Sequence, residues 1–286
     1  MPSLIDIRRR IRSVKNTQQI TKAMKMVSAA KLRRAQDRVI ASRPYGALLR
    51  KVLANVAAAV GSDENTGRNK LLARRPEQNV LLVLISGDKG LAGAFNTNTI
   101  KGVQRFISEN PNSKVQLELI GRKGRDFFRK RSAAIHGEHI GLAAKVVYND
   151  VAAIARQAIE MYCNEEIDAV YLIYNEFKSV VAQKLTQSRV LPVELPEEQA
   201  PVDYIFEQPP AEMLNALLPR YVEMEFYRAL LESAAAEHAA RMTAMDAATS
   251  NAGEMIDKLT LYMNRVRQAS ITKEIIEVVS GAAAAE

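Results

Sequence analysis

The first 60 residues carry the apolar pattern of a coiled-coil helix. Helix-forming residues dominate, and apolar positions follow one another in steps of three and four, with one slip between Val14 and Thr17. From Ser3 onward the breakers are Pro44 and Gly46, so the pattern predicts a long helix that is bent or broken near Pro44. The predicted seam consists of Leu4, Ile7, Ile11, Val14, Thr17, Ile20, Met24 and Val27. A stripe this narrow is typical of a helix that pairs with another helix.

A second helical pattern begins near Ala211 and runs almost to the end of the chain, with Pro219 and Gly253 as its breakers. Its apolar positions alternate strictly in steps of three and four: Met242, Met245, Thr249, Ala252, Ile256, Leu259, Met263 and Val266. Roughly 70 residues at about 1.5 Å each make a helix of about 100 Å, longer than a small domain is wide. Its last turns are apolar or small: Ile275, Ile276, Val278, Val279, then GAAAA. Such a tip is unfavourable in water, so we expect it to project into a protein socket.

Between these helical ends, strand and helix patterns alternate. Residues 61–76 are polar and turn-rich, which indicates a boundary, and five prolines between residues 191 and 210 indicate a connector. The sequence predicts strands at 80–86, 115–120 and 169–177, helices at about 96–108, 121–131 and 142–164, and an antiparallel edge strand at 183–191. This alternation favours βαβ units and a largely parallel sheet.

The patterns divide the chain into three parts: an N-terminal coiled-coil helix (1–60), an α/β globular domain with a proline-rich connector (61–209) and a C-terminal coiled-coil helix (210–286). Their net charges are +12, 0 and −4, so the two ends can attract each other or meet differently charged partners. Two long helices at opposite ends of one chain can pair as an antiparallel coiled coil. The predicted fold class is therefore α/β, with a long antiparallel coiled coil flanking the globular domain.

Composition narrows the class of protein. Hydrophobic residues make up 48% and charged residues 25% of the chain, as in ordinary folded, soluble proteins. No apolar run approaches the ~20 residues of a membrane-spanning helix, and no secretory signal pattern follows the first charges. The single cysteine, Cys163, cannot form an internal disulfide, and we expect it to be a semi-buried packing residue of a helix. These features favour an intracellular, reducing setting.

The glycine-rich segment 86–96, SGDKGLAGAFN, is the strongest candidate for phosphate chemistry. Its glycines have the spacing G-x-x-G-x-x-G, which matches neither the dinucleotide fingerprint nor the P-loop, so a structural turn is favoured over a nucleotide site. His136 and His139 stand in an HGEH pair without further ligands, which favours a solvated loop over a metal site. No catalytic, cofactor-binding or metal-binding residue is therefore predicted, although a nucleotide-binding α/β enzyme stays an alternative.

The basic N-terminal helix raises a second alternative, nucleic-acid binding. It lacks interleaved aromatic residues before Tyr45, and the acidic C-terminal helix would repel phosphate nearby. A solvated coiled-coil face or an acidic protein partner is the favoured interpretation.

The end segments carry a family resemblance. Residues 7–36 (IRRRIRSVKNTQQITKAMKMVSAAKLRRAQ) and 239–284 (AARMTAMDAATSNAGEMIDKLTLYMNRVRQASITKEIIEVVSGAAA) closely resemble the gamma subunit of F-type ATP synthases, and ISGDKGLAGAFN is similar to its first strand and turn. The resemblance implies a rotor shaft inside a hexamer of alpha and beta subunits, with a Rossmann-like domain near the epsilon subunit and the c-subunit ring. It also implies no catalytic residue, no cofactor, and a peripheral position at the cytoplasmic face of the plasma (inner) membrane.

The resemblance further implies which residues meet partners. Contacts to the alpha/beta hexamer, or support for them, are expected from Met24, Lys25, Arg241, Arg267, Gln268, Thr272, Glu274 and Glu277. Contacts to the c ring and epsilon are expected from Tyr204 and Glu207. Arg267 and Gln268 can offer directional hydrogen bonds to a loop carboxylate. Because the two-cysteine regulatory insert of the family's photosynthetic members is absent, thiol switching is not expected. Pro219 leaves the start of the C-terminal helix open.

Overall fold

The computed structural model describes residues 3–60, 69–131, 133–194 and 207–283. The chain forms two compact units. The coiled-coil unit combines residues 1–28 with residues 242–286, and the sheet unit comprises residues 29–241. Helices α1 (Leu4–Val60) and α5 (Pro210–Ala283) contribute residues to both units, and each unit is described by itself.

The sheet unit is built on one five-stranded sheet with the order β3-β2-β1-β4-β5. The strands are β1 (Asn79–Ile85), β2 (Lys114–Ile120), β3 (Ile135–His139), β4 (Ala169–Phe177) and β5 (Gln183–Leu191). All neighbouring pairs are parallel except β4 with β5, which is antiparallel. This is a doubly wound, Rossmann-like order, which confirms the predicted α/β fold and the predicted antiparallel edge strand.

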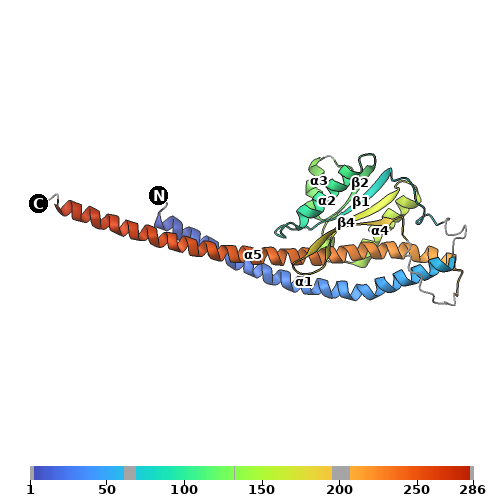
Figure 1. The fold of residues 1–286 in the computed structure, drawn as a ribbon, viewed down its shortest axis with the longest axis horizontal. Coiled ribbons are helices and arrows are strands. Elements are labelled where there is room, and N and C mark those ends of the chain that lie inside the picture. The colour runs from blue at the N-terminus through green and yellow to red at the C-terminus, as the bar shows by residue number, and fades with distance from the viewer. Residues whose placement is uncertain (1–2, 61–68, 132, 195–206, 284–286) are drawn as a thin grey trace. The chain divides into compact units, whose positions relative to one another are not determined.

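Helices cover both faces of this sheet. They are α2 (Phe95–Glu109), α3 (Arg122–Phe128) and α4 (Tyr148–Cys163), with short 3₁₀ helices η1 (Arg129–Arg131) and η2 (Leu142–Ala144). On one face Val103 and Phe106 of α2 pack on Leu82 and Leu84 of β1. Figure 1 shows α4 and α5 on the opposite side from α2 and α3. Residues 80–85 of β1 are all buried because neither face of the strand meets water.

Helix α5 is held to the sheet unit along its first half. Val222, Phe226 and Leu230 recur at intervals of four and are fully buried. Glu223, on the same helix, accepts hydrogen bonds from Tyr148 and Arg156 of α4, each at 2.6 Å. Burial, together with the neighbouring carboxylate, raises the pKa of Tyr148 to about 12. The phenol therefore stays protonated and donates to Glu223, which fastens α4 to α5.

The two prolines that were expected to interrupt the long helices do not do so. Helix α5 begins at Pro210, a residue that suits the first helical position, and continues through Pro219. Helix α1 continues through Pro44, so the predicted alternative of a break there is wrong. Pro44 and Ile40 are both exposed, so the carbonyl that Pro44 leaves without an amide partner can be hydrated.

Two local predictions need correction. The HGEH segment is not a solvated loop: it belongs to edge strand β3, where His139 Nε2 lies 2.5 Å from the buried Glu118 carboxylate. Gly137 is required beside this contact, since a Cβ there would come within 2.3 Å of Glu118 Oε1. The helix predicted at 142–164 begins only at Tyr148, after η2, because Gly141 with φ +86° starts a separate turn.

Candidate functional site: the paired terminal helices

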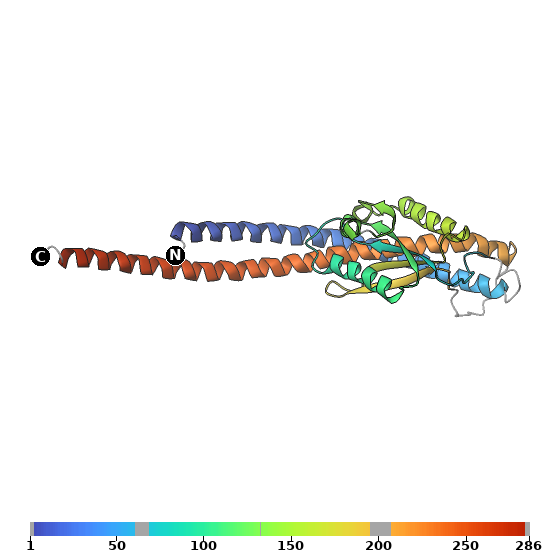
Figure 2. The same ribbon diagram turned by 90° about the horizontal axis from the view of Figure 1, so that it is seen from above.

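The coiled-coil unit consists of the two terminal helix segments lying side by side (Figures 1 and 2). On α5 the predicted seam is confirmed, with Met245 and Ala252 buried and the other seam residues from Met242 to Val266 partly buried. On α1 Ile7 is buried, and Ile11 and Val14 are partly buried. Apolar side chains at intervals of three and four therefore close the interface between the helices.

After Val14 the seam on α1 differs from the sequence prediction. Thr17, Ile20 and Val27 are exposed, while Gln18 is partly buried and Thr21 and Ser28 are buried. The regular steps of three and four continue without a slip, and they place polar residues at the interface. Thr21 and Ser28 carry no apolar signal for this register, but a strict heptad continuation from Val14 predicts it.

Hydrogen bonds between the helices explain the polar seam. The hydroxyls of Thr21 and Thr249 lie 2.8 Å apart, and the Gln18 side-chain amide donates to the carbonyl of Thr249 at 3.4 Å. Gly253 leaves room for Gln18, whose Nε2 would lie 3.2 Å from an added Cβ. Polar pairs at a seam fix the register, because a shift would bury them without partners.

Charged groups flank this seam. Lys25 forms an ion pair with Asp246 at 2.6 Å, and both side chains are about half exposed. At the start of α1 Asp6 accepts hydrogen bonds from the hydroxyl and amide of Ser3, while Ser3 Oγ accepts from the Asp6 amide. These bonds lower the pKa of Asp6, which keeps an anion at the helix N-terminus. Lys25, one of the predicted partner contacts, is thus also a contact within the pair.

The end of α5 extends beyond its partner helix. Thr21 faces Thr249 and Lys25 faces Asp246, so the antiparallel register puts Leu4 opposite roughly residue 266. The remaining residues to Ala283 form a tip of about 24 Å with no helix beside it (Figure 2). Its large apolar side chains, Ile271, Ile275, Ile276, Val278 and Val279, are 49% to 72% exposed. A continuous apolar surface of this kind marks an interaction site.

Five of the predicted contact residues lie on this tip or at its base, and all five are exposed: Arg267, Gln268, Thr272, Glu274 and Glu277. Thr272 donates to the Gln268 carbonyl at 2.9 Å, and Glu277 pairs with Lys273 at 3.4 Å. No hydrogen bond or ion pair engages the side chains of Arg267 and Gln268 within the described parts of the chain. Arg267 and Gln268 are therefore available to an outside partner. Met24 of α1, another predicted contact, is partly buried, so the exposed part of its side chain is also available.

Further apolar side chains lie on the outer faces of the pair. Ile20, Met26 and Val27 of α1 are 55% to 67% exposed, and Met255, Leu261 and Tyr262 of α5 are 42% to 61% exposed. The sequence prediction had placed Ile20 and Val27 in the seam and so missed them as surface. Together with the tip they give the coiled-coil unit apolar surface on several sides.

Arg241 has a different environment from the other predicted contacts. It belongs to the sheet unit, and only 10% of its side chain is exposed. Its guanidinium pairs with Glu237 and reaches the backbone carbonyl of Gly90 at 3.4 Å. Arg241 therefore holds the glycine-rich turn against α5 within its own chain. Its expected role toward the hexamer, as a contact or as support for one, stays a prediction.

The same contacts decide the role of the glycine-rich turn. The turn follows β1, where the strand order reverses and where ligands of doubly wound sheets bind. Here a Cβ on Gly87 would lie 2.9 Å from the Glu237 carboxylate, and the Gly87 amide already donates to Asn96 at 2.8 Å. A carboxylate of the chain itself occupies the place that a phosphate would need. This arrangement favours the structural turn.

Two other predictions concern residues before α5. Glu207 is exposed, and Tyr204 lies outside the described residues. No described helix is long and apolar enough to cross a membrane. No group of three or more potential metal ligands occurs in the described ranges.

His238 gives the sheet unit a predicted pH dependence. Burial, with Arg241 and Lys31 nearby, lowers the pKa of this imidazole to about 4. Between about pH 6.5 and pH 4 the imidazole is protonated in the unfolded chain but neutral in the folded one. The free energy of unfolding is therefore highest above pH 6.5 and falls as the pH is lowered through this window. We expect the urea midpoint of the His238→Gln variant to decrease less than that of the unmodified chain as the pH is lowered. The midpoints are measured at several pH values in phosphate-free buffer. A parallel decline in both proteins would contradict the assignment.

Comparisons with known proteins agree with this architecture. A family model described as ATP synthase matches residues 3–285. The ATP synthase gamma chain of Solibacter usitatus (strain Ellin6076) is 79% identical over 286 residues, the full length of both chains. The ATP synthase gamma chain of Anaeromyxobacter sp. (strain Fw109-5) is 52% identical, with 99% of each chain covered.

Solved structures show the same fold. A chain from the central stalk and c ring of the Tetrahymena thermophila mitochondrial ATP synthase has a TM-score of 0.63 and 28% identity, covering 80% of this chain and 99% of that one. A chain of the Euglena gracilis mitochondrial enzyme has a TM-score of 0.67 at 21% identity, covering 98% and 94%. The fold of this chain thus matches chains of solved ATP synthases, one of them from a structure of the central stalk and c ring. Within the ATP synthase family, the chain belongs to the gamma chains.

Proposed function

We propose that the chain is the rotor shaft that couples rotation of a membrane c ring to ATP synthesis or hydrolysis at beta-subunit sites, without catalysing the reaction itself. The observation that carries this proposal is the tip of α5, whose exposed apolar side chains have no partner helix. A surrounding ring of alpha and beta subunits would supply the missing contacts.

Coupling requires that the faces of the shaft differ. A ligand or partner can shift a conformational equilibrium only through different interaction free energies with its states. The coiled-coil unit has such differences: apolar side chains such as Ile20 and Leu261 lie on its outer surface, and Lys25 and Asp246 form a charged spot. Three beta subunits around one such shaft would each meet a different face, which would hold their sites in different states.

The remaining partners follow from the same proposal. Epsilon and the c ring would meet the sheet unit near Glu207 and Tyr204, and the complex would sit peripherally at the cytoplasmic face of the inner membrane. In this proposal the terminal helices, residues 1–60 and 210–286, would form the shaft. The globular domain, residues 61–209, would form the base. A nucleotide-binding enzyme is disfavoured, because Glu237 and Arg241 fill the crevice beyond β1. The nucleic-acid alternative gains no structural support.

The test is reconstitution of the full chain with the alpha and beta subunits of its complex, followed by measurement of ATP hydrolysis. Arg267→Ala and Gln268→Ala each remove a donor expected to bind a charged partner, so turnover should fall about tenfold while assembly persists. Arg105→Ala and Gln104→Ala are the matched controls, because both side chains are exposed on α2. The proposal fails if the chain neither assembles nor changes turnover, and the roles of the two residues fail if the controls lose as much.

A further inference from the structure

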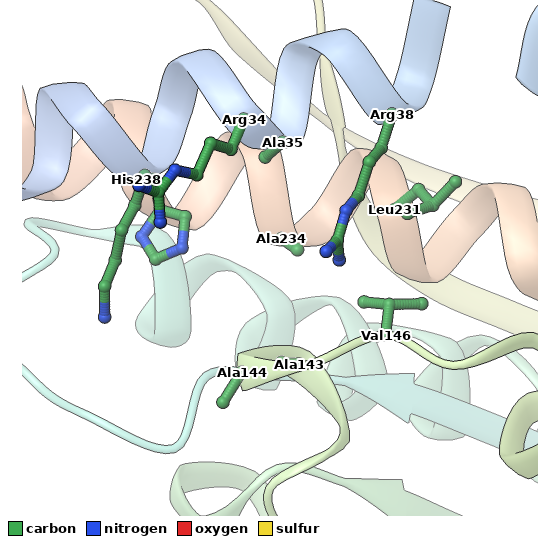
Figure 3. A pocket seen from close by; sticks show the side chains of 10 residues that line it. Arg34, Ala35, Arg38, Ala143, Ala144, Val146, Leu231, Ala234 and His238 are labelled. Carbon is green, nitrogen blue, oxygen red and sulfur yellow. The ribbon is translucent and has the colours of Figure 1, made fainter. Parts of the chain in front are cut away.

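The sheet unit contains a cavity of about 170 Å³. Three segments form it: one face of α1, the η2 turn with Val146 just after it, and part of the first half of α5 (Figure 3). The lining residues are Lys31, Arg34, Ala35, Arg38, Ala143, Ala144, Val146, Leu231, Ala234 and His238. None of the comparisons or the shaft proposal gives this cavity a role.

Its charged lining is of one sign. Lys31, Arg34 and Arg38 follow one another at intervals of three and four, so they share one face of α1. Figure 3 shows the guanidinium of Arg38 extending from α1 toward Ala234 and Val146, and that of Arg34 beside the ring of His238. Across the described residues none of the three cations has an ion-pair partner. Like charges on adjacent turns repel one another unless an anion lies between them.

His238 adds an oriented donor. The Nη1 atom of Arg241 lies 3.5 Å from Nδ1 of His238, and a guanidinium can only donate, so Nδ1 accepts and the ring proton is on Nε2. The groups that face His238 are Lys31 from α1, with Arg34 and Arg38 along the cavity, and Arg241 from its own helix. Glu237, the acid that precedes His238 on α5, is already paired with Arg241.

The rest of the lining is apolar: Val146 and Leu231, together with Ala35, Ala143, Ala144 and Ala234, whose small side chains leave space beside the basic ones. We propose that this cavity binds a phosphate group. Two guanidinium forks match the oxygens of a tetrahedral oxyanion, and the ammonium of Lys31 adds charge from the same exposed face of α1. The bound group would bridge α1, the η2 turn and α5 within the sheet unit.

The experiment follows the three histidines of the full-length chain by NMR with ring-labelled histidine, while inorganic phosphate is added at constant ionic strength. His238 is expected to show a saturable shift and a rise of its apparent pKa by about 1 unit, as for an opposite charge within a few ångströms. His136 and His139 lie outside the cavity and serve as references in the same spectra. Movement of all three signals without saturation would overturn the proposal.

Variants and a second ligand sharpen the result. Arg38→Gln should weaken phosphate binding at least about tenfold. Arg33→Gln changes another exposed arginine of α1, one outside the cavity, and should leave phosphate binding unaltered. Equal binding of phosphate by the Arg38 variant and the unmodified chain would refute the site. ATP in place of phosphate identifies the source: equal affinity supports a site for inorganic phosphate, and tighter binding supports a nucleotide phosphate. Equal competition by acetate would show a nonspecific ion effect and overturn the proposal.

Discussion

Replacing Gly121 by alanine is expected to prevent the sheet unit from folding, with a loss of at least about 4 kcal/mol of unfolding free energy. A Cβ at this position would lie 2.0 Å from the carbonyl oxygen of Ser86 and 2.7 Å from its carbon, which are backbone atoms that cannot rotate away. The Ser86 amide is fixed by the Ile120 carbonyl at 2.8 Å, and the Gly121 amide by the His139 carbonyl at 2.8 Å. Three strands would have to separate to admit one methyl group.

Gly141→Ala is the control for backbone conformation. Gly141 (φ +86°, ψ −10°) lies in the left-handed helical region, whereas Gly121 (φ +99°, ψ 144°) lies in a region that is essentially restricted to glycine, so both substitutions carry a positive-φ cost, roughly 1 to 3 kcal/mol, and that of Gly121 is the larger. A Cβ at Gly141 meets no atom within 4 Å, so the steric cost is confined to Gly121. Soluble yield and urea unfolding followed by circular dichroism separate the two. Similar losses in both variants would show that φ, and not the approach of β1 to the end of β2, sets the requirement for glycine.

Two leucines of α5 are expected to give opposite results when each is changed to alanine. Leu230 is 0% exposed in the sheet unit, so Leu230→Ala should cost about 2 to 5 kcal/mol through lost burial and the cavity left behind. Leu261 is 61% exposed in the coiled-coil unit, so Leu261→Ala should change the stability of the chain alone by no more than about 0.5 kcal/mol. Thermal and urea unfolding of the two variants measure this difference directly.

In the assembled complex, Leu261→Ala should have a larger effect on assembly and ATP turnover than Leu230→Ala. If Leu261 meets the alpha/beta ring, as the rotor proposal requires, Leu261→Ala should weaken assembly or lower ATP turnover. Leu230→Ala, where it still folds, should leave both near the level of the unmodified chain. Lys258→Ala, an exposed change less than one turn from Leu261, controls for a general effect of mutating this stretch. A Leu261 variant with unchanged assembly and turnover would remove this face from the proposed contact surface.

Sequence patterns predicted the elements whose environment is simple. The run from Val80 to Ile85 predicts a buried strand because both of its faces are covered by helices. The stripe from Met242 to Val266 predicts a seam because every member is apolar or small and keeps the interval of three and four. Strand β3 was missed because its residues, IHGEH, carry no apolar alternation: it is held by parallel pairing to β2 and by the contact of His139 with Glu118.

Some features of the candidate site were also predictable from the sequence, and others were not. The exposed tip could be predicted, since a helix that is longer than its partner must leave residues uncovered. Arg267 and Gln268 were expected as partner contacts only from the family resemblance. The exposure of Ile20 and Val27 could not be read from an apolar pattern, because Thr21 and Ser28 occupy the seam through hydrogen bonding and small size. The cavity between α1 and α5 was likewise invisible, because its basic residues and His238 are about 200 positions apart in the sequence.

By itself, the sequence determined the two long helices, the alternating strands and helices between them, and the uncovered apolar tip. Periodicity is a local property, and it reports the environment of a segment along its own length. The tertiary structure alone decided that Arg241 secures the glycine-rich turn, that polar side chains occupy part of the helix seam, and that three cations line one cavity. Each of these depends on which distant segment supplies the opposing atoms, and distance in space is not encoded in the spacing of residues along the chain.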